Sequence, residues 1–520
     1  MLNSSLLQAT VLSVVCRQAW CISILQKTTF AMDPVTIVLS AVVILLLTYV
    51  YNNWKQNYNN FPPGPKPLPI IGNLHMVDKN KPMNTCLELS KKYGPVLGIH
   101  LGMIKMVVLS GYDTIKDALI NHAEEFSDRL VPPIMSKMAK DNGIIYANGE
   151  NWKVMRRFTI STLRDFGMGK KSIENKIVEE AACLTQAIKS YGGKPFDNLP
   201  VINAAVANII VSILLNRRFE YDDPTILKLM YLINTNIKLM GKPIAMLYNC
   251  FPYVMDWLPG VHQSVFENFR TLFNFIRATF RKQKEELDVN DQRNLIDAFL
   301  VKQLEEKPES TLYYHNDNLT VLIADLFGAG MDTTSTTLRW GLLLMMKYPD
   351  IQKKVQNEIE RVVGSAQPRV EHRIQMPYTD AVLHEIQRFG DILPGSALHS
   401  TSQDVTFRGY FIPKGTFVIP FLTTALRDAA YFEKPDEFYP EHFLTSEGQF
   451  KKNEAFIPFS LGKRSCAGQN LAKMELFVFF TALLQNFTFQ GTPGAQLDLT
   501  PELGATNAPR PYDTCAIPRS

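Results

Sequence analysis

The 520-residue chain lacks the features that mark several classes of protein. Its formal net charge is only +4, far from the strongly basic composition of a nucleic-acid-binding protein. Its seven cysteines are scattered, odd in number and include no Cys-x-x-Cys, which favours reduced thiols on the cytosolic side over a disulfide framework. A hydrophobic fraction of 46% allows a sizeable core. We therefore expect a large globular protein with no nucleic-acid partner.

One long stretch has no charge at all. Residues 34–54, PVTIVLSAVVILLLTYVYNNW, are uncharged, and the apolar run is long enough for one transmembrane helix. The alternatives are a buried core helix and a cleaved signal peptide, and no small-x-small cleavage site supports the second. We predict a membrane anchor at 32–60 and assign no function to the extension at 1–31. Translation could start at Met1 or at Met32.

The remainder, 61–520, has the pattern of one large domain. It begins with a stiff proline-rich tether, FPPGPKPLPIIGN, at 61–73. Strand patterns are few, and two of them, 96–110 and 405–420, resemble hairpins, the second turning at Pro413–Gly415. Helical periodicity dominates elsewhere. The predicted fold class is therefore mostly α with a small β annex, behind an N-terminal transmembrane helix.

The longest helical pattern, 318–348, contains FGAGMDTTSTT near its centre. A helix of this length would span about 45 Å. Each of its two internal glycines, Gly328 and Gly330, costs about 1 kcal/mol relative to alanine. The pattern suggests that something must approach the backbone there.

The segment FSLGKRSCAG, 459–468, places one cysteine among glycines and basic residues just before an apolar helix. Arg464 and the helix N-terminus would stabilise a Cys466 thiolate. No ligands with zinc spacing surround it, whereas a hydrolytic nucleophile with a distant histidine stays possible. A stabilised thiolate beside glycines that admit a flat group suits haem iron.

These residues match F-x-x-G-x-R-x-C-x-G, and the chain resembles the cytochrome P-450 monooxygenases in this segment. The anchor, the PPGP tether and the residues within the motifs resemble those of the microsomal family-two enzymes, with subfamily K as the nearest candidate. The resemblance implies the P-450 fold and haem b, with its iron ligated axially by Cys466. It also places Phe459, Arg464 and Gly468 in the cofactor site.

Three further stretches resemble the same family. AGMDTT, 329–334, is similar to its oxygen-activating signature, which implies that Thr333 positions oxygen and protons and that Asp332 helps to relay protons. Glu385 and Arg388 are similar to its E-x-x-R pair. The usual third member, an arginine, is replaced here by His442 in PEHF, which puts the strength of this structural triad in question.

The third stretch, Trp152 to Arg156, matches W-x-x-x-R. Buried haem propionates need cations or strong donors. The resemblance gives that role to Trp152 and Arg156, to Arg464, to Arg129 in FSDRL and to His399 in SALHS.

No nucleotide-binding pattern supplies electrons within the chain. The resemblance implies an NADPH–cytochrome reductase as partner, aided by a microsomal b-type cytochrome, at the endoplasmic reticulum membrane with the catalytic body on the cytosolic face. Lys451, Lys452, Lys463 and Lys473 could form a docking face. The implied activity inserts one oxygen atom from O2 into small lipophilic substrates such as xenobiotics, fatty acids or steroids. By family position the substrate pocket includes Asp325, Phe327, Ala329, Leu393, Ser396, Ala397, Thr506 and Asn507.

Two alternatives remain. Within the same fold, a peroxide-rearranging or dehydrating haem enzyme is disfavoured by Thr333 and Asp332. From another class, the chain could be a haem-binding sensor or sterol carrier that never activates oxygen.

Overall fold

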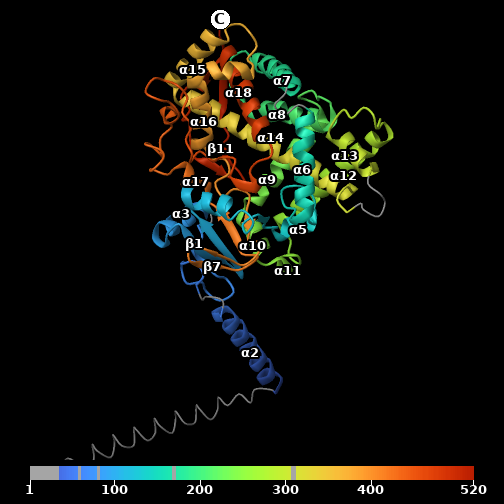
Figure 1. Cartoon of the computed structure of the whole chain (residues 1–520), viewed down its shortest axis with the longest axis vertical. Helices are drawn as coiled ribbons and strands as arrows, with labels where there is room; N and C mark the ends of the chain where they lie inside the picture. The colour runs from blue at the N-terminus through green and yellow to red at the C-terminus, as the bar shows by residue number, and fades with distance from the viewer. Residues whose placement is uncertain (1–33, 57–59, 79–81, 167–170, 306–311, 520) are drawn as a thin grey trace, which may run out of the picture. The chain divides into compact units, whose positions relative to one another are not determined.

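The computed structural model describes residues 34–56, 60–78, 82–166, 171–305 and 312–519 (Figure 1). The predicted extension at 1–31 lies outside the described residues. The chain forms two compact units, Met1–Phe61 and Pro62–Ser520. In the first unit helix α2 spans Pro34–Gln56. Across the described ranges no helix has both the length and the apolar character needed to cross a membrane. The membrane anchor therefore stays a prediction.

Helices make up most of the second unit, as predicted. Many begin with proline in the first turn, where a missing N–H costs no hydrogen bond. The helices are α3 Pro82–Tyr93, α4 Tyr112–Lys116, α5 Pro133–Ala139, α6 Gly149–Asp165, α7 Lys171–Lys189, α8 Leu199–Leu215, α9 Pro224–Met240, α10 Pro243–Cys250, α11 Pro252–Met255, α12 Val261–Glu285, α13 Leu295–Glu305, α14 Asn316–Lys347, α15 Pro349–Val362, α16 Pro377–Gly390, α17 Leu422–Leu426 and α18 Gln469–Asn486. Short helical turns lie at η1 Leu74–Met76, η2 Asp117–Asn121, η4 Val370–Gln375, η5 Pro440–Phe443 and η6 Gly462–Arg464.

The β structure is confined to small sheets. The largest has the order β1-β2-β8-β5-β3, with β1 and β2 antiparallel and β2 parallel to β8. The others pair β4-β12-β9, β6-β7 and β10-β11. The strands are β1 Val96–Leu101, β2 Ile104–Leu109, β3 Asp128–Arg129, β4 Phe196–Asp197, β5 His399–Ser400, β6 Val405–Phe407, β7 Tyr410–Ile412, β8 Phe417–Pro420, β9 Phe487–Gly491, β10 Pro501–Leu503, β11 Asn507–Pro509 and β12 Asp513–Pro518.

One of the two predicted hairpins is confirmed, whereas the predicted position of the turn in the other is wrong. β1 and β2 form the hairpin expected at 96–110. At 405–420 the chain turns earlier, at Arg408 and Gly409, whose φ angles of 49° and 84° are left-handed. The last strand, β8, leaves this hairpin and pairs with β2 in the large sheet. β8 also pairs with β5, and β5 pairs with β3. The large sheet therefore positions Arg129 on β3 and His399 on β5 for the site described below.

The long helix α14 passes through the middle of the body beside α18 (Figure 1). Its second half is buried almost continuously, as is most of α18. A Cβ atom on Gly330 would come within 2.5 Å of Ile210 on α8, whereas one on Gly328 would meet nothing closer than 3.9 Å. Gly330 therefore lies where α14 and α8 pack closely, so that a side chain there would displace Ile210, whereas a side chain on Gly328 would start with an ordinary contact.

Candidate active site around Cys466

Cys466 lies between η6 and the start of α18. Its backbone N–H donates to the carbonyl of Phe459 at 3.0 Å, which closes the loop. Gly462 has a left-handed φ of 71°, and a Cβ there would lie 2.1 Å from the carbonyl oxygen of Leu119. Glycine is thus needed at 462 because the loop packs closely against Leu119, and not because a ligand approaches the backbone there. Gly468 is different, because a Cβ there would only touch the Cys466 sulfur, at 4.0 Å.

The surroundings of the Cys466 thiol have opposing effects on its pKa. Burial raises the thiol pKa, while the N–H groups of Gly468 and Gln469 and the charge of Arg156 lower it. The side chain is nevertheless accessible to solvent. A sulfur that is enclosed by protein and still accessible borders an internal space. Amide donors and a cation facing it are what a thiolate metal ligand requires.

Three arginines converge beside this loop without carboxylate partners. Arg129 and Arg464 are buried and Arg156 is half-buried. Burial lowers the pKa of each, and Arg129 further lowers that of Arg464. Among the described residues none of the three forms an ion pair. Uncompensated buried cations are costly, so this cluster suits a bound anion.

The cluster is held by backbone carbonyls. Arg464 donates from Nε to Ser127 at 2.7 Å and from Nη2 to Ala147 at 2.9 Å. Arg156 donates to the carbonyl of Ser465 at 2.6 Å, directly before the cysteine. Pairing of β3 with β5 sets Arg129 opposite His399. The Arg464 guanidinium also lies over the Trp152 ring, 3.6 Å from its centre.

Four buried donors or ring nitrogens in this cluster have no partner within the described chain. They are Arg129 Nε, Arg464 Nη1, Trp152 Nε1 and His399 Nε2. Buried polar atoms are rarely left unpaired, so their clustering indicates a missing polar group. The three arginine charges and the unpaired N–H groups fit the two propionates of haem b, with Cys466 at hand for the iron.

His399 has a defined tautomer. Its Nδ1 lies 2.7 Å from the carbonyl of Phe126, which can only accept, so Nδ1 carries a proton. Burial and the charge of Arg129 lower the pKa of His399 well below its usual value. In the neutral ring Nε2 is therefore an acceptor, and it becomes a donor only when the ring is protonated.

The middle of α14 presents one face to open space. Asp325, Ala329 and Thr333 share this face at i, i+4 and i+8. Ala329 is exposed, although Phe327 and Met331, two residues before and after it, are buried. The Thr333 hydroxyl donates to the Ala329 carbonyl at 2.8 Å. Phe327 is two residues from Ala329 and so on the opposite face, where it lines a small apolar cavity against α8, α9 and α12. The structure does not bring Phe327 to the Asp325–Thr333 face.

Two carboxylates on α14 have specific partners. Asp325 Oδ2 accepts the backbone N–H groups of Ile144 and Ile145, at 2.8 and 3.0 Å. Burial still raises the pKa of Asp325 to about 7. Asp332 Oδ2 accepts the hydroxyl of Thr506 at 2.9 Å, and burial raises the pKa of Asp332.

The remaining predicted pocket residues have mixed surroundings. The Asn507 amide donates to the Asp391 carbonyl at 2.9 Å, and its own carbonyl accepts from Trp340 Nε1. The Ala397 carbonyl accepts from Arg129. Leu393, Ser396 and Ala397 are half-buried. Asn507 thus joins the C-terminal strands to α14, and the Leu393–Ala397 loop adjoins the arginine cluster.

The Glu385–Arg388 pair is completely buried. Arg388 makes two parallel hydrogen bonds to the carboxylate, both 2.7 Å long. Its other N–H groups donate to the carbonyls of Leu426, Pro435 and Glu437. His442 completes the group through Glu385 Oε2 at 3.2 Å. The predicted triad is therefore assembled.

Sequence reasoning missed two members of this region. Asn148 accepts the Arg129 backbone N–H at 2.7 Å and an Arg464 N–H at 2.9 Å, so it ties both arginines together. Glu475 on α18 is buried, which raises its pKa to about 8. Asn148 stands directly before α6, a position typical of caps, but nothing in the sequence connects it to residue 464.

The Cys466 loop beside a cluster of unpaired buried donors that suits two carboxylates, together with an acid and a threonine in the middle of α14, is typical of a haem-thiolate protein. The sequence profile of Cytochrome P450 matches residues 62–516. Cytochrome P450 2K4 of Oncorhynchus mykiss is 46% identical over 488 residues, 92% of this chain and 97% of that protein. Cytochrome P450 2C14 of Oryctolagus cuniculus is 45% identical over 492 residues, covering 94% and 100%. Cytochrome P450 2K6 of Danio rerio is 48% identical over 458 residues, covering 87% and 90%.

The chain belongs to the cytochrome P450 family. It is a haem-thiolate monooxygenase whose haem b iron is ligated by a cysteine, and Cys466 stands at that position.

Proposed function

We propose that this protein is a membrane-bound monooxygenase that inserts one oxygen atom from O2 into small lipophilic molecules, with electrons from NADPH through a reductase. The observation that carries it is the set of unpaired buried donors around the Cys466 loop. Haem held there supplies reductive activation of oxygen. Arg129, Trp152, Arg156 and Arg464 would donate to its propionates, and His399 would join them only in its protonated form. Phe459 and Gly468 lie in the loop that surrounds Cys466.

Thr333 and Asp332 are the proposed proton-handling groups. The Thr333 hydroxyl lies on the exposed face of α14 and is held by the Ala329 carbonyl. Burial raises the pKa of Asp332, which favours the protonated carboxyl that a proton relay requires, and the Thr506 hydroxyl fixes its orientation. Asp325, Ala329 and the loop at Leu393–Ala397 would line the substrate space, which suits a lipophilic molecule.

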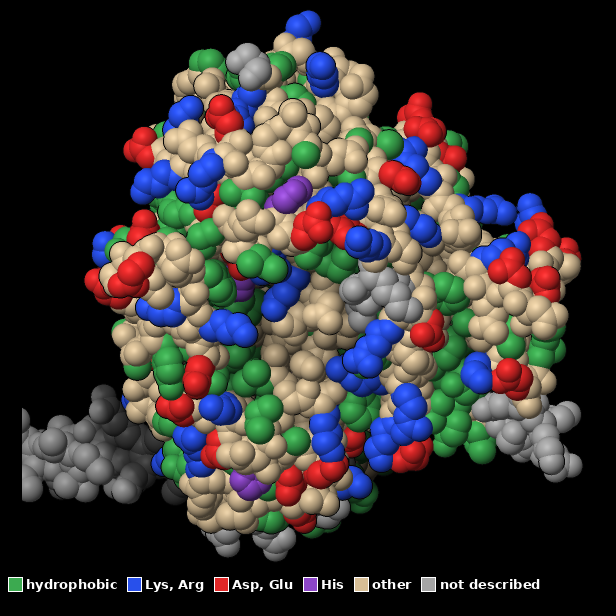
Figure 2. All heavy atoms as spheres, turned by 45° about the horizontal axis from the view of Figure 1, so that its top comes forward, with side chains coloured by type: hydrophobic (Ala, Val, Ile, Leu, Met, Phe, Trp, Pro, Cys, Tyr) green, Lys and Arg blue, Asp and Glu red, His purple; other side chains and the backbone are tan. Residues whose placement is uncertain are grey.

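Electron supply is proposed to come from NADPH–cytochrome reductase, aided by a b-type cytochrome. Basic side chains gather around the middle of one face of the body (Figure 2), which suits an acidic partner. Lys451 and Lys452 are exposed. Lys463 is already paired with Glu124, and Lys473 is half-buried near the Phe459 ring. The first two lysines are therefore the better candidates for docking.

Membrane attachment at the endoplasmic reticulum, with the body on the cytosolic face, is proposed on two grounds. The first is the uncharged run at 34–54. The second is an apolar surface of the body that includes Tyr253 and Trp257 near α11, which are 87% and 89% exposed. Ile70 and Met103 are also exposed, and Gly102 packs against Phe251 and the Ile70 backbone, which brings these segments together. Aromatic side chains of this kind favour the membrane interface.

The deciding experiment is a spectrum of the purified, dithionite-reduced protein under carbon monoxide. We expect the long-wavelength Soret band of thiolate-ligated haem and its loss in Cys466→Ser. A band at the usual histidine-ligated position in fresh protein would overturn the proposed ligand. Substrate-dependent NADPH consumption with the reductase then separates a monooxygenase from a haem-binding sensor or carrier, which would show the spectrum but no turnover.

A further inference from the structure

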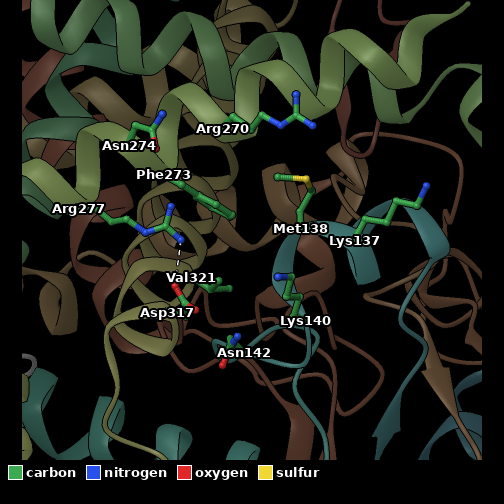
Figure 3. A pocket seen from close by; sticks show the side chains of 10 residues that line it. All are labelled: Lys137, Met138, Lys140, Asn142, Arg270, Phe273, Asn274, Arg277, Asp317 and Val321. Atoms are coloured by element: carbon green, nitrogen blue, oxygen red, sulfur yellow. Dashed lines mark hydrogen bonds and ion pairs between the residues drawn. The ribbon is translucent and has the colours of Figure 1, made fainter. Parts of the chain in front are cut away.

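A second cavity lies away from the Cys466 loop. It measures about 340 Å³ and opens between α5, α12 and the first turns of α14 (Figure 3). None of the residues of the proposed haem or substrate site lines it. A ligand here would therefore occupy a site that the proposed function leaves unused.

The cavity carries an excess of positive charge. Lys137, Lys140, Arg270 and Arg277 line it, against one carboxylate, Asp317. Asp317 is paired with Arg277 at 3.0 Å, as Figure 3 shows. Lys137 is paired with Asp256, outside the cavity lining, at 2.5 Å.

The other two cations are weakly compensated. Arg270 lies 3.6 Å from Glu267 in an exposed pair, which contributes little. Lys140 forms no ion pair with any part of the chain that the structure describes. Arg270 and Lys140 thus leave positive charge available to a ligand.

The cationic side chains of α12 are arranged by helical spacing. Arg270, Asn274 and Arg277 follow one another at i, i+4 and i+7, so they share one face. Figure 3 shows them along one side of the cavity, with α5 on the other. Lys140 ends α5 in a left-handed conformation with φ of 47°. Cations thus lie on both sides of the opening.

The floor of the cavity is apolar. Phe273 and Val321 line it and form a small separate cluster with Ala139. Met138, a flexible side chain that adapts to different shapes, packs against this cluster. A cationic rim over an apolar floor is complementary to a molecule with an anionic head and an apolar body.

We propose that this cavity binds a single-chain anionic amphiphile, such as a carboxylate, sulfate or phosphate monoester of a lipophilic molecule. The volume is at the lower end for ligand sites and would not hold the two chains of a phospholipid. We therefore assign the site to a free amphiphile and not to a lipid of the membrane.

One short segment, 142–145, links this cavity to Asp325, a residue of the proposed substrate site. Asn142 lines the cavity, and a Cβ on the next residue, Gly143, would lie 2.7 Å from Val321 and 2.4 Å from Asp325. Asp325 holds the following N–H groups, those of Ile144 and Ile145. A ligand in the cavity would contact the outer side of a segment whose inner side is held by Asp325.

Binding can be tested directly on the holoenzyme by equilibrium dialysis with radiolabelled laurate. An iron-coordinating azole at saturation occupies the space above the haem, so that only outer binding is measured. We expect laurate to bind and methyl laurate to bind much more weakly. In the double variant Lys140→Gln/Arg270→Gln laurate affinity should fall about tenfold, as two lost charge contacts imply. Both side chains are exposed, so folding should be unaffected.

The matched control is Lys282→Gln/Arg281→Gln, which removes one lysine and one arginine from α12 outside the cavity lining. It should leave laurate binding unchanged, and added salt should weaken binding to the wild type. Equal affinity for acid and ester, an equal loss in the control, or complete displacement by the azole would each overturn the proposal. So would vesicles of phosphatidylserine binding through these residues while laurate does not. Because dialysis needs no turnover, failure of the monooxygenase assay would leave this result standing.

Discussion

His442 Nδ1 lies 3.2 Å from Glu385 Oε2, while its Nε2 accepts the backbone N–H of Lys434 at 3.1 Å. Because Nε2 accepts, the proton of the neutral ring must be on Nδ1, which then donates to the carboxylate. The histidine thus provides a donor for the Glu385 carboxylate and an acceptor for the Lys434 N–H, without adding a second positive charge next to Arg388. Its ring also packs edge-on against Phe432.

We predict that His442→Phe destabilises the protein by about 2–5 kcal/mol, since it leaves the Glu385 carboxylate and the Lys434 N–H each short of a partner. Thermal unfolding of the holoenzyme and the rate of haem loss would measure this. His75→Phe, at an exposed position, is the control. If the two variants melt at the same temperature, the histidine contributes nothing to the triad.

Local sequence patterns predicted the parts of this protein that depend on neighbouring residues. The long central helix, the 96–110 hairpin and the mostly α class with small sheets follow from periodicity and turn chemistry, and the structure confirms them. The cysteine loop and the E-x-x-R pair are also short-range motifs. Helical phase alone could have separated Phe327 from the Asp325–Ala329–Thr333 face.

What the sequence could not predict depends on contacts between distant segments. The Asp332–Thr506 bond joins residues 174 positions apart, and the Gly330–Ile210 contact joins two helices. Neither leaves a local signal. The hydrogen bonds from the Ile144 and Ile145 backbone to Asp325 could not be predicted either. A single acid in a helix is equally compatible with a substrate contact and with a bond to the backbone.

Asp325 predicts a pH dependence of stability. Its pKa rises from 3.8 to about 7 on folding, so the folded state keeps a proton that the unfolded state loses between about pH 4 and 7. Stability must therefore fall as pH rises through this window, and level off above it. Asp325→Asn keeps an acceptor for the Ile144 and Ile145 N–H groups but cannot titrate.

Relative to Asp325→Asn, the wild type should lose roughly 2 kcal/mol between about pH 5 and about pH 8, less than the full shift implies because the side chain is half-buried. Thermal midpoints of both proteins at the two pH values test this. Asp222→Asn, at an exposed position, should show no such difference. A constant gap between wild type and Asp325→Asn would contradict the prediction.

Thr506 should control the proton held by Asp332. Its hydroxyl donates to the carboxylate at 2.9 Å and lowers the pKa of Asp332 against the larger effect of burial. In Thr506→Val that pKa should rise further, because the charged carboxylate loses a hydrogen-bond donor. The acid limb of the pH–rate profile for substrate-dependent turnover would move to higher pH. Thr506→Ser keeps the hydroxyl and should retain the wild-type profile, so identical limbs in both variants would remove Thr506 from the proton path.

Substitutions at two buried tryptophans should distinguish an effect on haem binding from an effect on folding. Trp152 Nε1 has no partner in the described chain, whereas Trp340 Nε1 donates to the Asn507 carbonyl at 2.9 Å. Trp152→Phe should cost the apoprotein no hydrogen bond but remove a donor to a propionate, and haem loss to an acceptor protein should be about tenfold faster. Trp340→Phe should do the reverse: it lowers the thermal stability of the apoprotein by leaving a buried carbonyl unpaired, with little effect on haem loss. Equal haem-loss rates in the two variants would mean that Trp152 does not contact the cofactor. The comparison is informative because both substitutions remove the same atoms from a buried ring, while only the Trp340 indole has a hydrogen-bond partner within the described chain.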